Sequence, residues 1–214
     1  MAYRKNKVKL IWSNNLAYVI GIIATDGNLS PDLRHIHITS KDYEMVMNCK
    51  KCLNINNKIG KKARGGEKDK KYFVLQFGDV NFFNFLLDVG LTPRKSKTIQ
   101  KLKIPHIYFA HFFRGCIDGD GSISISAHPE SKHPQYKFRL CSASKKFLDW
   151  NLKMCRMFFK IEGGSIGKLD MSSVYTLSFG KSDSVKILKM IYFKNVICLS
   201  RKQKIVSKIL GQVA

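Results

Sequence analysis

The 214-residue chain is poor in acidic side chains. It has only 15 Asp and Glu against 38 Lys and Arg, which gives a formal net charge of +23 at pH 7. Because solubility does not require so large an excess, it favours a polyanionic partner, most commonly a nucleic acid. A membrane surface is the weaker alternative, since it would favour one basic amphipathic helix, whereas these basic residues are spread along the whole chain.

Long hydrophobic runs are also lacking. The longest, residues 16–24, is about half of the length that a bilayer span requires. The N-terminal segment is basic and has neither the apolar run nor the small-residue cleavage site of a signal peptide. We therefore expect a soluble, intracellular protein, in a bacterial cytoplasm or an organelle.

The ligand pattern of a structural zinc site and nucleotide-binding loops are missing too. Cys49 and Cys52 form a CxxC, but no second ligand pair matches it and the segment has helical periodicity, so a helix with reduced thiols is the better interpretation. The six His residues form no clustered motif, although His35 and His37 alternate on a predicted strand and either face DNA or serve a structural role. The sequence contains no Walker loop, nucleotide-binding GxGxxG or nucleophile elbow.

An internal repeat organises the chain. Four short motifs occur twice in the same order: VIGIIATDG at 19–27 and FRGCIDGDG at 113–121, IGK at 59–61 and 166–168, LQFG at 75–78 and LSFG at 177–180, and PRKSK at 93–97 and SRKQK at 200–204. The pattern predicts an α+β fold of two αββαββα units, residues 1–103 and 104–214. In each unit one face of an antiparallel sheet packs on helices and the other is solvated.

Small residues at helical spacing mark one helix in each unit. The first helix is expected to begin with Asn14 as its N-cap and to stop at Gly27. Ala17, Gly21 and Thr25 leave a stripe without bulk on it, and Gly115 and Gly119 occupy the matching places in the second unit. Because such stripes let two backbones approach closely, we expect the two helices to pack against each other as a pseudo-symmetric pair.

That packing would bring Asp26 and Asp120 together at two helix C-termini. Carboxylates so placed repel each other and the negative end of each helix dipole, so folding alone does not favour the arrangement. A divalent cation between them would make it favourable. Hard oxygen ligands suit Mg²⁺, or Mn²⁺ or Ca²⁺ in the same site. A metal held by acids in a basic groove is typical of phosphodiester hydrolysis.

The two longest motifs resemble those of the single-chain LAGLIDADG homing endonuclease family, and the resemblance covers nearly the whole chain. The matching Gly and acid positions are Gly21, Asp26 and Gly27, then Gly115, Asp118, Asp120 and Gly121. The resemblance implies repeats packed through their LAGLIDADG helices, with Gly21 and Gly115 at the interface, and sheets that form a DNA-binding saddle. It also implies that Asp26 and Asp120 are the metal ligands. Ala24 replaces the earlier acid of the first motif, a position that is not a metal ligand in the family.

The resemblance assigns further site residues. Lys95 and Lys202 match lysines placed near the scissile phosphates, often at the turn before the last helix of each half. Each lysine serves either in catalysis or as a phosphate clamp. Ser40 and Ser142 are the nearest matches to a polar residue that positions water.

Side chains on the solvated sheet faces are the candidates for reading a major groove. They are Arg34, Gln76, Lys137, Arg139 and Thr176, while the loop at 62–71 is expected to contact the DNA backbone. Because the two halves differ at nearly all such positions, the target should be asymmetric.

The sequence therefore predicts a monomeric, Mg²⁺-dependent endonuclease that cuts both strands of a specific DNA site. One alternative is an RNA maturase that assists splicing of a group I intron and has the host intron RNA as its partner. Another is a DNA-binding regulator that does not cleave, against which the two acids argue.

Overall fold

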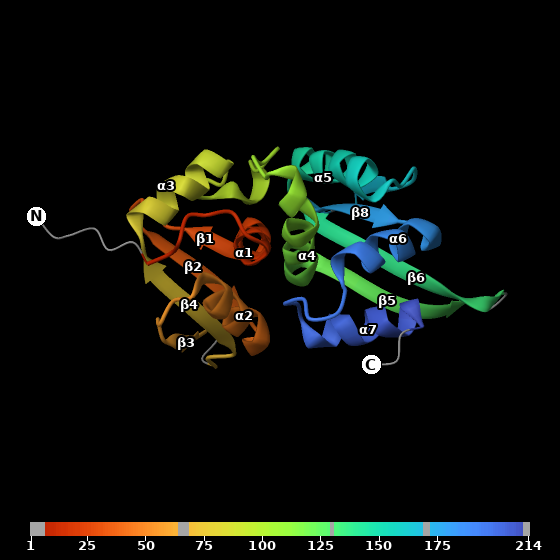
Figure 1. Ribbon diagram of the computed structural model, residues 1–214, viewed down its shortest axis with the longest axis horizontal. Coiled ribbons are helices and arrows are strands. Elements are labelled where there is room, and N and C mark those ends of the chain that lie inside the picture. The colour runs from red at the N-terminus through yellow and green to blue at the C-terminus, as the bar shows by residue number, and fades with distance from the viewer. Residues whose placement is uncertain (1–6, 64–68, 129–130, 169–171, 212–214) are drawn as a thin grey trace, which may run out of the picture.

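The computed structural model describes residues 7–63, 69–128, 131–168 and 172–211. The two halves lie side by side, each with its own sheet and helices (Figure 1). The first half contains α1 (Asn14–Thr25), β1 (Gly27–Leu29), β2 (His35–Ser40), α2 (Tyr43–Leu53), β3 (Ile59–Lys62), β4 (Tyr72–Gly78), α3 (Val80–Val89) and the 3₁₀ helix η1 (Lys95–Lys97). The second contains the 3₁₀ helix η2 (His106–Tyr108), α4 (Phe109–Asp120), β5 (Gly121–His128), β6 (Ser131–Ser142), α5 (Lys145–Phe159), β7 (Ser165–Lys168), β8 (Tyr175–Phe179), α6 (Lys181–Ile191) and α7 (Ser200–Leu210).

The two sheets have the same topology. Each is antiparallel and four-stranded, with strand order β1-β2-β4-β3 in the first half and β5-β6-β8-β7 in the second. Ile38 pairs with Leu75 in one sheet and Leu140 with Leu177 in the other, so the repeat seen in the sequence is also a repeat of register. The predicted α+β fold of two αββαββα units is confirmed. The second half departs from it by adding α7, where the first half has only η1.

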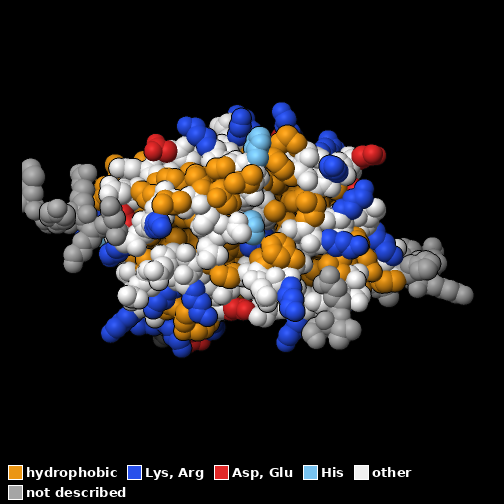
Figure 2. All heavy atoms as spheres, in the orientation of Figure 1, with side chains coloured by type: hydrophobic (Ala, Val, Ile, Leu, Met, Phe, Trp, Pro, Cys, Tyr) orange, Lys and Arg blue, Asp and Glu red, His pale blue; other side chains and the backbone are white. Residues whose placement is uncertain are grey.

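Alternating side chains give each sheet one buried and one solvated face. On β6, Phe138 and Leu140 are buried, whereas Lys137 and Arg139 are exposed, as their spacing predicts. The face of the molecule that Figure 2 shows carries hydrophobic side chains over its centre, with Lys and Arg toward its upper and lower margins. None of the helices in the described parts of the chain combines the length and the hydropathy needed to cross a bilayer.

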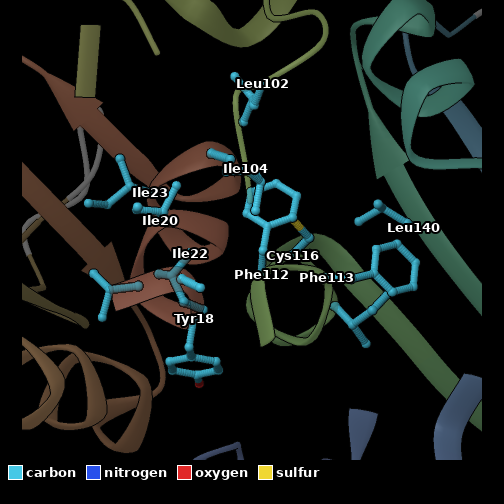
Figure 3. Close-up of a cluster of buried hydrophobic side chains, with 14 of the residues drawn as sticks. Tyr18, Ile20, Ile22, Ile23, Leu102, Ile104, Phe112, Phe113, Cys116 and Leu140 are labelled. Atoms are coloured by element: carbon cyan, nitrogen blue, oxygen red, sulfur yellow. The ribbon is translucent and has the colours of Figure 1, made fainter. Parts of the chain in front are cut away.

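Helices α1 and α4 pack backbone to backbone in the middle of the molecule. A side chain at Gly21 would overlap the carbonyl oxygen of Phe112 and come within 2.9 Å of the Cα of Gly115, and one at Gly115 would overlap the carbonyl oxygen of Tyr18. Residues 16–24 are buried throughout. Around the contact, Ile23 points toward the first sheet and Phe113 toward Leu140 of the second (Figure 3). The predicted helix pair is therefore present.

The ends of α1 differ in detail from the sequence-based expectation. Its N-cap is Ser13, whose hydroxyl accepts from the amide of Leu16 at 3.1 Å, and not Asn14, which is already helical. At the other end Gly27 opens β1 without adopting a left-handed conformation. Glycine is required there because a side chain would approach the Cα of Ile23 to 2.6 Å.

Contacts between α2 and the start of α7 join the two halves a second time. Figure 1 shows α7 beginning beside α2, and the carboxylate of Glu44 accepts from the backbone amide of Ser200 at 3.0 and 3.1 Å. Arg201 donates to Asp42 at 3.0 Å, and Asn48 donates to the carbonyl of Cys198 at 3.0 Å. An acid of the first half thus caps a helix of the second.

Candidate functional site

The two predicted acids meet where α1 and α4 end. Asp26 caps the C-terminus of α1, and Asp120 is the last residue of α4. A side chain at Gly119 would lie 2.7 Å from Oδ2 of Asp26, so the first acid lies against the backbone that carries the second. Asp26 and Asp120 line the same cavity of about 530 Å³.

Basic side chains share this cavity with the acids. Lys41, Lys62, Arg94 and Lys95 line it. Among the described residues, no group of three or more His, Cys, Asp or Glu side chains is placed to hold a metal. The chemistry available here is therefore that of two carboxylates surrounded by positive charge.

Burial and charge couple the acids to the two predicted lysines. Burial raises the pKa of Asp120, and the charges of Lys202 and Lys95 oppose that rise. Burial lowers the pKa of Lys95 to about 8, and the carboxylates of Asp26 and Asp120 oppose that fall. Burial also lowers the pKa of Lys202 to about 8, opposed most strongly by Asp118. Both lysines are therefore weaker bases than exposed lysines, and they lose their protons at a lower pH.

Both lysines bind backbone carbonyls just beyond the acids. Lys95, 5% exposed, donates to the carbonyl of Gly27, and Lys202, 1% exposed, donates to that of Gly121 at 2.8 Å. Lys202 also donates to the carbonyls of Ile117 and of Asp118, the latter at 3.0 Å. Lys202 thus neutralises the negative end of α4, and each of the two ammonium groups fixes the chain that follows an acid.

The expected position of these lysines needs correction. Lys95 lies on η1, after α3, and Lys202 lies in the first turn of α7, so neither is in a turn that precedes the last helix. Both segments nevertheless bring a lysine to the carbonyl that follows an acid, because each side chain is long enough to reach Gly27 or Gly121. Of the two lysines, Lys95 lines the cavity.

Ser40 and Ser142 occupy equivalent positions, as the last residues of β2 and β6. The hydroxyl of Ser40 accepts from the amide of Asp42 at 3.0 Å, and that of Ser142 accepts from the amide of Ser144 at 3.1 Å. Each hydroxyl thus shapes the entry to the next helix. Ser40 also lines the cavity that contains Asp26 and Asp120.

Asp118 forms a buried network that sequence reasoning missed. Its carboxylate, in a residue 1% exposed, accepts from the hydroxyls of Tyr18 at 2.9 Å and Tyr192 at 2.6 Å and from the amide of Leu199 at 2.9 Å. Arg114, also buried, stacks over the Tyr18 ring. The motif indicated an acid at this position, but no local signal identifies its partners, which are distant in sequence. Asp118 therefore holds elements of both halves together.

The predicted groove-reading residues fall on two sheets and one turn. Gln76, Lys137 and Arg139 are exposed and Thr176 is half-buried, all on the faces turned away from the core. Arg139 and Thr176 line a second hollow of about 320 Å³. Arg34 was expected on a strand face. It lies instead in the turn before β2, where the carboxylate of Asp32 accepts from its amide at 3.1 Å, one residue before the strand begins at His35.

Two other expectations concern the same surface. His35 and His37 lie on β2, His35 bound to Asp32 and His37 opposite Gln76. Of the loop at 62–71, residues 64–68 lie outside the described part of the chain. Cys49 and Cys52 lie on α2 as free thiols, as predicted.

Comparison with known proteins identifies the fold of the chain. No family model and no curated protein matches the chain. Among solved structures, homing endonuclease I-DmoI in complex with DNA and Ca has 15% identity and a TM-score of 0.61, over 91% of this chain and 97% of that one. The N-terminal LAGLIDADG domain of DUF199/WhiA has 18% identity and a TM-score of 0.57, over 92% and 89%. The chain has the two-repeat LAGLIDADG fold.

Full-length DUF199/WhiA from Thermatoga maritima also matches, with 18% identity and a TM-score of 0.58. The match covers 96% of this chain but only 64% of that one. At such identities the likeness establishes the LAGLIDADG fold alone. In that fold α1 and α4 are the LAGLIDADG helices, and the cavity lies at their C-terminal ends.

Proposed function

We propose that the protein is a site-specific endonuclease that hydrolyses both strands of double-stranded DNA at an asymmetric target. The observation that carries the proposal is the convergence of Asp26 and Asp120, from two pseudo-symmetric helices, on one cavity lined by basic side chains. Neither the fold nor the core gains from placing acids at two adjacent helix C-termini. Hydrolysis of a phosphodiester at this cavity would explain why the two acids lie there.

The donor set fits a divalent cation such as Mg²⁺. Two carboxylates from facing helices supply hard oxygen ligands, and the cavity leaves room for the waters and phosphate oxygens that complete such a site. Asp26 and Asp120 would hold the ion. When bound, the cation would activate water and stabilise the leaving oxygen. I-DmoI has been solved with its target DNA and Mg, and with DNA and Ca or Mn, which supports DNA and divalent ions as ligands here.

Each cut consumes one water. The oxygen of water bonds to phosphorus, the bond from phosphorus to one deoxyribose oxygen breaks, and the proton that water loses is balanced by the proton that this deoxyribose oxygen gains. Lys95 and Lys202 hold the carbonyls that follow the two acids, and so keep the carboxylates in place. The solvated sheet faces, with Gln76, Lys137, Arg139 and Thr176, bind the duplex on either side of the cut.

The test begins with finding the target. The full chain is incubated with Mg²⁺ and a plasmid library that carries a randomised insert, and linearised plasmids are sequenced. We expect a single asymmetric site to be enriched. Asp26→Asn and Asp120→Asn should each reduce cleavage at least about 10³-fold and leave binding within a few-fold, because the carboxylates serve hydrolysis and not the groove.

Normal cleavage by either variant would contradict the assignment of the acids. Two other outcomes would replace the proposed function. Specific binding without cutting by the unmodified chain would indicate the DNA-binding regulator. Promotion of group I intron splicing without DNA cleavage would indicate the maturase.

A further inference from the structure

We propose that a hollow beside the cavity of the two acids binds an unpaired nucleotide, whose base stacks on Tyr43 and whose phosphate is held by Lys41 and Arg201. This aromatic hollow has a volume of about 520 Å³. It is lined by Ser40, Lys41, Asp42, Tyr43, Phe73 and Arg201. The inference goes beyond cleavage of a duplex, because a single strand would occupy this site whether or not it is cut.

The aromatic hollow lies on the opposite side of the first sheet from the proposed duplex-reading residues. Phe73 precedes the buried Leu75 by two residues on β4, so its side chain lies on the face that the helices cover. Gln76 lies on the other, solvated face. Ser40 and Lys41 line both the aromatic hollow and the cavity that contains the acids, so the two sites adjoin.

Two aromatic rings form the apolar part of the aromatic hollow. Tyr43, the first residue of α2, is 47% exposed. Its ring centre lies 5.0 Å from that of Phe73, and the two ring planes are inclined by 68°. In such an edge-to-face pair one ring presents its edge and keeps both of its faces out of the contact. A nucleobase of any sequence stacks on a face of this kind.

Positive charge surrounds the rings. Lys41 and Arg201 line the aromatic hollow, and the ammonium of Lys61 lies 5.6 Å from the centre of the Phe73 ring. The Arg201 side chain is 60% exposed, and Nε donates to Asp42 at 3.0 Å, which leaves the terminal nitrogens of the guanidinium for other acceptors. Asp42 is the one acid among the described residues that line the aromatic hollow, so its net charge is positive.

The combination of ring faces and cations selects the class of ligand. A duplex keeps the faces of its bases in the stack and offers its phosphates alone, so it would leave the rings without a partner. A free phosphate would also use only the cations. An unpaired nucleotide carries a flat base and a phosphate on one sugar, and proteins that bind single strands combine aromatic side chains with a basic groove.

Such a nucleotide has two sources. One is a DNA strand that is unpaired near the adjoining cavity, and the other is RNA. Both present the same phosphate and a base face of the same kind, and RNA adds a 2′-hydroxyl. The shared base and phosphate define the ligand, and a comparison of the two strands identifies the source.

The first measurement uses the full-length chain, no divalent cation and a single-stranded DNA of about ten nucleotides. Anisotropy of a labelled strand gives the affinity, and a fluorescent adenine analogue, whose emission falls on stacking, reports contact with a ring. Tyr43→Ala should weaken binding about tenfold and restore the emission of the analogue. Tyr43→Phe keeps the ring and should bind within about twofold of the unmodified protein.

The controls separate the base from the phosphate. Phe193→Ala is the matched control, since Phe193 is an aromatic residue that is 44% exposed and lies outside the aromatic hollow, and it should leave affinity unchanged. The unmodified protein and Tyr43→Ala should bind a strand with abasic sites equally well, because only the phosphates remain. Lys41→Ala should reduce the salt slope by about 0.7, as expected for one phosphate of a single strand, whereas Tyr43→Ala should not change it.

An RNA of the same sequence forms the second arm. Tighter binding of either strand through Tyr43 supports the site and identifies its source. Equal affinity of Tyr43→Ala and the unmodified protein for both strands, or an equal loss on a blunt duplex, would overturn the inference. Thermal unfolding checks each variant. If Tyr43→Ala does not fold, Tyr43→Leu decides, because it keeps an apolar contact with Phe73 and lacks the ring.

These measurements are independent of the proposed endonuclease. They include no divalent cation and require no target sequence. Loss of the single-strand site would therefore leave the proposed DNA cleavage untouched, and a chain that cuts no DNA would still show the site if the inference is correct.

Discussion

Asp118 lies two residues before Asp120 on α4, and the two carboxylates have different surroundings. That of Asp118 is buried among two tyrosine hydroxyls and a backbone amide, whereas Asp120 lines the cavity. The first repeat has Ala24 in place of the buried acid and Asp26 in place of the other. The cavity thus receives one acid from each repeat, whereas the acid of the buried network comes from the second repeat.

Burial and, to a smaller extent, the charge of the nearby Arg114 together lower the pKa of His111 to about 4. Nδ1 of His111 lies 3.0 Å from Nη2 of Arg114 and serves as the acceptor, so a proton there would face a guanidinium. In the unfolded chain the same imidazole titrates near pH 6.5. Between these two pH values the unfolded state binds more protons than the folded state does. The contribution of His111 to the free energy of unfolding is therefore fully present above about pH 6.5 and is lost as the pH drops toward 4.

We therefore predict that His111→Gln makes the protein less sensitive to acid. Gln keeps an acceptor for Arg114 and does not titrate. Between pH 7.5 and 4.5 the unmodified protein should lose about 1 kcal/mol more of its unfolding free energy than the variant does, a value reduced because the half-exposed ring is screened by solvent. Urea unfolding at both pH values measures it, and equal losses would contradict the argument.

The contact between α1 and α4 leads to a prediction at the scale of elements. Gly21→Ala would force a methyl group into the carbonyl oxygen of Phe112, so the helices must separate. We expect a loss of about 3 kcal/mol, although alanine gains up to about 1 kcal/mol in helix propensity.

Gly167→Ala on β7 is the matched control, since nothing lies within 4 Å of the added carbon. It should leave stability nearly unchanged. Denaturant midpoints for both variants give the answer, and a Gly21→Ala protein as stable as the control would mean that the helices do not approach as closely as described.

Sequence predicted the elements better than it predicted their ends. Alternation fixed the faces of β4 and β6, and the spacing of Gly21 and Gly115 identified the helix pair, because both patterns reflect direct contact with the core. Ser13 and Asn14 are both good caps, so the start of α1 could not be decided locally. The similar motifs PRKSK and SRKQK form different elements, the short helix η1 and the first part of α7. The sequence did not predict this difference, because it depends on the residues that follow each motif.

The sequence predicted that Asp26 and Asp120 lie together, and it did not predict the contacts that hold their surroundings in place. Motif spacing brought Asp26 and Asp120 together, but the acceptors of Lys95 and Lys202 are backbone carbonyls, which leave no trace in sequence. The tyrosines that bind Asp118 lie 100 and 74 residues away from it. The roles of Lys95, Lys202, Ser40 and Ser142 in catalysis, and of the sheet residues in DNA binding, stay predictions.

At the scale of the whole molecule, the net charge of +23 predicts a steep salt dependence of DNA binding. If six or more phosphates are neutralised, affinity for the selected duplex should fall about 10³-fold or more between about 50 and 200 mM salt. Fluorescence anisotropy at several salt concentrations measures the slope. Lys137→Ala should reduce that slope by about 1, and a response close to flat would argue against a phosphate-binding surface.

The cap that Glu44 provides for α7 restricts how this protein could be re-engineered. A chimera that joined one half to a foreign counterpart would sever the contacts of Asp42 and Glu44 with Arg201 and Ser200, and Lys202 lies in that same helical turn. A recombinant of such halves would thus keep these contacts only if α2 and α7 came from the same parent.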